Sequence, residues 1–119
     1  MQNKKNLSER LIEFGAGSIK LTSKIDNTYA GRHISNQLMR SATSSGANYE
    51  EACGAESKAD FIHKRQIVLK ELRESFYWLK LIRKSGLSQD KEIQNFTLET
   101  EELIKIVAKS VITAKRNRK

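Results

Sequence analysis

The stretch that decides the fold reads Ser44-Ser45-Gly46-Ala47-Asn48-Tyr49-Glu50-Glu51-Ala52 and is followed, after a short break, by Ser57-Lys58-Ala59-Asp60-Phe61-Ile62-His63-Lys64. The small residues of the first segment allow a neighbouring backbone to approach closely. Gly54 is typical of a left-handed helix cap, and Ser57 with Asp60 three residues later resembles a capping box. The stretch therefore predicts two helices joined by a short connection.

Apolar residues recur at steps of three and four along the rest of the chain, which is the spacing of one helical face. The pattern predicts four helices, over about residues 7–26, 33–53, 57–85 and 89–114, with a connection at 26–31 between the first two. The chain has 119 residues and no proline, which suits one domain of long helices. Because short connections make successive helices antiparallel neighbours, we expect a single all-α, up-down-up-down four-helix bundle over residues 1–119, with a basic tail at 115–119.

The composition argues against several classes of protein. The single cysteine, Cys53, has no partner for an intramolecular disulfide and no companions for a zinc cluster. No run approaches the roughly 20 apolar residues of a membrane span, and the first residues lead into no apolar signal segment. We expect a soluble cytoplasmic protein that makes no membrane contact.

The third predicted helix has an unusually broad apolar surface. On a helical wheel its apolar residues spread over roughly 220°, whereas a helix in a monomeric bundle needs a stripe only somewhat wider than about 100°. The surplus predicts that a second subunit covers part of this helix. The alternative is a central helix that contacts both of its neighbours within one chain.

Glu71 falls inside this apolar arc and Glu74 flanks it. A carboxylate there needs a hydrogen-bonded or charged partner, because an isolated buried charge is very costly. Arg40, Asn48 and Glu51 lie along one edge of the second predicted helix. We expect the five to form a structural polar cluster.

A catalytic or metal-binding role for these carboxylates is the alternative, and the sequence argues against it. A di-iron bundle needs two Glu-x-x-His motifs, and neither histidine of this chain follows a glutamate at that spacing. Cys53 with His33 or His63 is not a recognisable nucleophile pair, and no phosphate-binding glycine loop occurs. We therefore expect no catalytic residue, no metal, no cofactor and no enzymatic activity.

Basic residues are the one functional group present in quantity. The net charge is +8, and residues 103–119 contain six basic side chains and no acidic one. The six are Lys105, Lys109, Lys115, Arg116, Arg118 and Lys119. Such a segment is typical of phosphate contact, and a solubilising tail is the alternative. A second basic group, Lys80, Arg83 and Lys84, lies at the end of the third helix. Few aromatic residues are available to read bases, so binding should depend little on nucleic-acid sequence.

Three parts of the chain resemble the bacterial 23S ribosomal RNA intervening-sequence proteins: Ser44–Ala52, Ser57–Lys64 and the run Tyr77-Trp78-Leu79-Lys80-Leu81-Ile82. The likeness covers about residues 7–117. This chain reads Ser45-Gly46-Ala47-Asn48 where many members have a proline-containing sequence, and Arg65 stands where relatives often have an apolar residue.

The resemblance implies a left-handed four-helix bundle that assembles as a homopentamer. Some members are encoded inside intervening sequences of the 23S ribosomal RNA gene, and a related group serves as a nucleic-acid-binding accessory protein to a reverse transcriptase. No enzymatic activity is established for the family. We therefore expect a non-enzymatic, basic homo-oligomer that binds RNA or DNA through charge. The alternative is a protein-interaction or accessory module with no direct nucleic-acid role.

Overall fold

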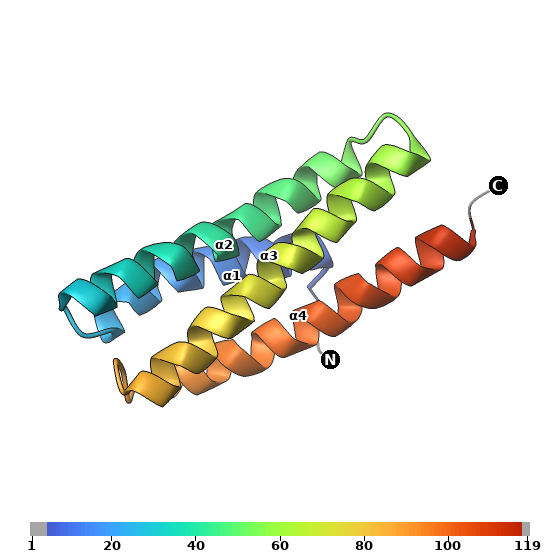
Figure 1. Ribbon diagram of the computed structural model, residues 1–119. Coiled ribbons are helices and arrows are strands. Elements are labelled where there is room, and N and C mark those ends of the chain that lie inside the picture. The colour runs from blue at the N-terminus through green and yellow to red at the C-terminus, as the bar shows by residue number, and fades with distance from the viewer. Residues whose placement is uncertain (1–4, 118–119) are drawn as a thin grey trace.

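Residues 5–117 are described by a computed structural model, and they form four α-helices, one short 3₁₀ helix and no strand. The helices are α1 (Leu7–Leu21), η1 (Thr22–Lys24), α2 (Tyr29–Cys53), α3 (Lys58–Ser85) and α4 (Lys91–Arg116). Successive helices lie side by side, and α3 packs between α2 and α4 (Figure 1). The prediction of an all-α four-helix protein is confirmed.

Side-chain caps determine where the helices begin. Asn6 and Glu9 form a reciprocal capping box at α1, and Ser57 accepts a hydrogen bond from the Asp60 amide at the start of α3. Gly86 ends α3 at φ 76°, in the left-handed conformation that glycine adopts without strain. The predicted cap at Gly54 is wrong in its conformation, because this residue lies at φ −100°.

The first connection lies earlier in the chain than the predicted residues 26–31. Helix α1 ends at Leu21 and the chain tightens into η1, whereas α2 begins at Tyr29 instead of residue 33. Thr28 explains the early start of α2, since its hydroxyl accepts a hydrogen bond from the Gly31 amide at 3.0 Å. Gly31, predicted to lie in a connection, is therefore part of the first turn of α2.

The core consists of two apolar clusters stacked along the bundle. The first is centred on Leu11, Ala42, Leu72 and Leu103, and the second includes Leu38, Leu79, Ile82 and Ile93. Phe14 of α1 stacks on Phe96 of α4 with 4.6 Å between ring centroids, so α1 also reaches the far helix.

The broad apolar arc of α3 is mostly covered within one chain. Val68, Leu72 and Leu79 are fully buried, and most other members are half-buried. Because α3 packs against both α2 and α4, it is the central helix of the alternative interpretation. The width of its arc therefore does not by itself require a second subunit.

Candidate nucleic-acid interface

The predicted basic residues extend along the second half of α4. Lys105, Lys109, Lys115 and Arg116 are all exposed, and Arg118 and Lys119 lie outside the described residues. At 100° per residue, Lys105, Lys109 and Arg116 share one side of the helix, whereas Lys115 points about 100° or more away from Lys109 and Arg116. The structure therefore presents most of these charges to solvent on one face.

Helix α3 contributes a further cation to the same end of the bundle. The ammonium group of Lys58, at the first residue of α3, donates a hydrogen bond to the Asn117 carbonyl at 3.0 Å. Lys58 and Lys109 also line a shallow groove of about 470 Å³ between the start of α3 and the end of α4. Its apolar wall includes Phe61 and Ile106. No sequence pattern associates Lys58 with the basic tail, because it lies 47 positions before Lys105.

Lys105 lies in a different electrostatic environment from the other basic residues of α4. It lines a small surface pocket together with Glu99, Glu101 and Glu102, and Glu101 lies one helical turn before it. These carboxylates reduce the positive potential around Lys105. We therefore define the C-terminal basic end as Lys58, Lys109, Lys115 and Arg116.

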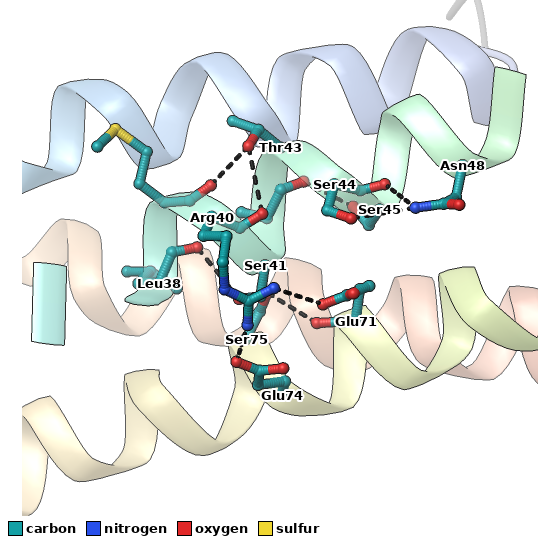
Figure 2. A network of polar contacts seen from close by, with 12 residues as sticks. Leu38, Arg40, Ser41, Thr43, Ser44, Ser45, Asn48, Glu71, Glu74 and Ser75 are labelled. Atoms are coloured by element: carbon teal, nitrogen blue, oxygen red, sulfur yellow. Dashed lines mark hydrogen bonds and ion pairs between the residues drawn. The ribbon is translucent and has the colours of Figure 1, made fainter. Parts of the chain in front are cut away.

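Three of the five residues predicted as a structural polar cluster meet between α2 and α3. Arg40 reaches across to Glu71, at 3.4 Å, and also pairs with Glu74 (Figure 2). The Trp78 indole donates a hydrogen bond to the same Glu74 carboxylate at 3.1 Å. Burial alone would raise the pKa of Glu74, but the hydrogen bonds from Arg40 and Trp78 outweigh it and hold that pKa below its ordinary value.

Asn48 and Glu51 are not part of this cluster, which corrects the prediction. The Asn48 amide donates to the backbone carbonyl and hydroxyl of Ser44, one turn back on its own helix (Figure 2). Glu51 pairs instead with Lys64 at 2.8 Å. Both lie farther along α2 than Arg40, where different residues of α3 face them.

A second contact between α2 and α3, which the sequence did not reveal, lies next to the cluster of Arg40, Glu71 and Glu74. The hydroxyls of Ser41 and Ser75 are 2.7 Å apart (Figure 2). Both residues are fully buried. The Ser41 hydroxyl also lies 3.2 Å from the Leu38 carbonyl oxygen, and the Ser75 hydroxyl lies 3.0 Å from the Glu71 carbonyl oxygen. Such a contact needs two small polar residues on facing helices. It fixes the close approach of α2 to α3 at mid-length.

Arg65 lies between two aromatic rings. Its guanidinium carbon is 4.5 Å from the Phe61 centroid and 5.0 Å from the Tyr49 centroid. The guanidinium also donates to the Ser110 hydroxyl of α4. Burial raises the pKa of Tyr49 above its ordinary value. Arg65 thus joins α2, α3 and α4 through cation–π and polar contacts instead of apolar packing.

Within residues 5–117, no group of three or more His, Cys, Asp and Glu side chains could hold a metal ion. His33, His63 and Cys53 are each exposed. Over the same residues, no helix is long and apolar enough to cross a membrane.

Comparison with known proteins agrees with the fold. The family model described as "23S rRNA-intervening sequence protein" matches residues 5–109. A solved structure from Bacteroides thetaiotaomicron, described as a protein with unknown function from the S23 ribosomal protein family, is 31% identical. It superposes with a TM-score of 0.82, over 89% of this chain and 98% of its own. No curated protein sequence matches at a significant level. With the family model spanning nearly the whole bundle, the chain belongs to the 23S rRNA-intervening sequence protein family.

Proposed function

We propose that this protein is a non-enzymatic, cytoplasmic homo-oligomer that binds RNA or DNA through charge. The observation that carries the proposal is the C-terminal basic end, where Lys58 of α3 joins the exposed cations of α4 in a segment without acidic residues from 103 onward. Cations on two packed helices hold a fixed spacing, which suits a polymer of regularly spaced phosphates.

Affinity should come from phosphate contacts, with little dependence on base sequence. Lysine and arginine at a helix surface contact the backbone, and each neutralised phosphate releases condensed counterions. The aromatic rings of this end, Phe61 and Tyr49, are half-buried and covered by the Arg65 guanidinium. They therefore offer little surface for base stacking.

A variant with Lys109→Gln, Lys115→Gln and Arg116→Gln should bind nucleic acid with a shallower salt dependence. Loss of three phosphate contacts should reduce the slope of log affinity against log salt by about 2 units. The slope can be measured by fluorescence anisotropy with a labelled oligonucleotide over a series of salt concentrations.

The matched control replaces Lys20, Lys70 and Arg73 by Gln, which removes the same number of lysines and arginines from exposed sites away from this end. Its slope should stay within about half a unit of the wild-type slope. Equal changes in both variants would show that net charge matters and that the C-terminal basic end does not.

We further propose that the helices alternate direction in a left-handed up-down-up-down bundle and that several copies assemble, with five favoured by the family resemblance. The apolar surface best suited to a second copy is a groove of about 610 Å³ between α1 and α2. Ile12 and Ile19 line it, with exposures of 72% and 54%, together with small residues such as Gly46 and Ala47. Its one charged lining residue is Glu50, so the groove is largely apolar.

An Ile12→Glu variant should therefore dissociate into subunits of 13.6 kDa, because a carboxylate in an apolar contact is costly to desolvate. Light scattering coupled to size exclusion measures the mass. Leu98→Glu is the control, since Leu98 is an exposed aliphatic residue of α4 outside this groove. A wild-type protein that is monomeric at micromolar concentration would contradict the proposed assembly.

The second candidate function is a protein-interaction module. The α1–α2 groove favours it, because the same apolar surface could accept a different protein instead of another copy. Salt separates the two functions: a complex formed by apolar contact should persist at salt concentrations that release nucleic acid.

A further inference from the structure

The end of the bundle opposite the C-terminal basic end has its own group of cations. They surround a cavity of about 810 Å³ at the turn between α3 and α4. The cationic lining residues are Lys80, Arg83, Lys84 and Lys91. We call this site the turn cavity.

The cations of the turn cavity are not engaged in ion pairs. Among residues 5–117, none of the four has an ion-pair partner, and the Lys80 ammonium lies 4.6 Å from the centroid of the Phe76 ring. The one acidic lining residue, Asp90, is already engaged: one carboxylate oxygen accepts a hydrogen bond from the Glu92 amide, and the other lies 3.5 Å from the Lys24 ammonium. Lys24 thereby neutralises the one carboxylate of the lining, and the cavity keeps a net positive charge.

The walls of the cavity also offer uncharged donors. Gln89, Gln94 and Asn95 line it together with Ser88, and side-chain amides are common phosphate-binding groups alongside lysine and arginine. The cavity is open to solvent, because Lys80, Lys84 and Lys91 in its lining are exposed. Its chemistry therefore suits an anion that carries several oxygen atoms, such as a phosphate group.

Lys91 of the turn cavity lies on the same side of α4 as Lys109 and Arg116 of the C-terminal basic end. Lys91 and Lys109 are 18 residues apart, which is five full turns, so they share one face about 27 Å apart along the axis. Arg116 lies on nearly the same face about 38 Å from Lys91. Glu99, Glu101 and Glu102 occupy the helix between them, so the two basic sites are separate and do not form one continuous stripe.

We propose that the turn cavity is a second phosphate-binding site and that it holds the backbone of the same nucleic acid whose other part lies on the C-terminal basic end. This inference rests on the proposed function and adds the geometry of binding. Two sites joined by a rigid helix bind a polymer with a gain from effective concentration, provided that the polymer is long enough to span them.

The spacing predicts a length threshold. Since duplex phosphates advance about 3.4 Å per base pair on each strand, a span of 27–38 Å corresponds to about 8 to 11 base pairs. A shorter duplex reaches one site at a time. A longer one reaches both, so affinity should rise in a step near this length and then change slowly.

The test is a series of hairpin duplexes with stems of about 6, 9, 12 and 18 base pairs, bound at low salt to the full chain. Wild-type affinity should rise at least tenfold between the shortest and the third stem. A double variant, Arg83→Gln with Lys84→Gln, should lose this step. Relative to the wild type, its affinity should fall about tenfold for the longest stem and less than threefold for the shortest.

The matched control is Lys70→Gln with Arg73→Gln, which removes one lysine and one arginine from the exposed middle of the same helix. It should keep the step. A step that persists in the Arg83 and Lys84 variant, or that is lost equally in the control, overturns the second site.

A separate readout distinguishes failure of the site from failure of the proposed function. Inorganic pyrophosphate should shift the backbone amide NMR signals of Ser88–Lys91 in the wild type and shift them much less in the Arg83 and Lys84 variant. If no duplex binds at any length, the proposed function fails. In that case, shifts caused by pyrophosphate still support a phosphate-binding site in the turn cavity. Absence of these shifts overturns that site as well.

Discussion

An Arg40→Met variant should lose about 3 kcal/mol of unfolding free energy, measured by urea denaturation at neutral pH. Methionine keeps most of the apolar stem of arginine but cannot pair with a carboxylate. The Glu71 side chain is 10% exposed, and Arg40 is the one cation within ion-pair distance of it among the described residues. Removing Arg40 therefore leaves a nearly buried negative charge without compensation.

Glu71→Gln should cost less than about 1 kcal/mol, although it alters the same contact. Arg40 is half-exposed and keeps Glu74 as a partner, so this substitution strands no charge. The contrast between the two variants identifies desolvation of Glu71 as the dominant effect. Equal losses would contradict this account and would point to the geometry of the whole cluster instead.

The effect of Arg40→Met should also depend on pH. The folded-state pKa of Glu74 is depressed, so its pairing contributes stability above the ordinary carboxyl pKa of 4.5 and loses it as pH falls through the folded value. The difference between wild type and Arg40→Met should therefore shrink below about pH 4. A difference that stays constant into the acid range would exclude a contribution from Glu74.

A Gly31→Ala variant should be destabilised by about 3 kcal/mol, as measured by thermal or urea unfolding. A Cβ atom at this position would lie 1.9 Å from the Asp26 carbonyl oxygen, far inside van der Waals contact. That carbonyl has little freedom to move, because it accepts a hydrogen bond from the Thr28 amide, and the Asp26 amide donates to the Leu87 carbonyl at 2.8 Å. Relief of the clash must therefore disturb the contact between the η1–α2 connection and the α3–α4 turn.

Gly54→Ala is the control for Gly31→Ala. An added Cβ at Gly54 meets only the Glu51 carbonyl, at 3.9 Å, and its φ of −100° suits any residue. Alanine there should be neutral or stabilising by up to about 1 kcal/mol, because it restricts the unfolded chain. A loss at Gly54 as large as at Gly31 would show that glycine is needed for a reason other than space.

The fold was predictable because its signals are local. Ser57 with Asp60 marks the start of a helix through a contact made within three residues. The start of α2 was predicted four residues too late. Thr28 caps the helix and Gly31 packs tightly against Asp26, but in the sequence a threonine followed by a glycine resembles a loop.

The candidate site was predictable only in part. Exposed cations on α4 follow from helical periodicity, whereas the proximity of Lys58 to Asn117 depends on how α4 returns along α3. The pairing of Arg40 with Glu71 and Glu74 followed from burial of a carboxylate in an apolar arc. Asn48 was misplaced because sequence alone does not decide whether a helical asparagine bonds to its own helix or to a neighbour.

Binding of wild-type protein to RNA and DNA across a salt series tests the central claim most directly. With four to six phosphate contacts, affinity should fall by about 50- to 1,000-fold between roughly 50 and 200 mM salt, with little difference among sequences of equal length. Failure of the wild-type protein to retard any RNA or DNA at the lowest salt concentration would contradict the proposed function and favour the protein-interaction module.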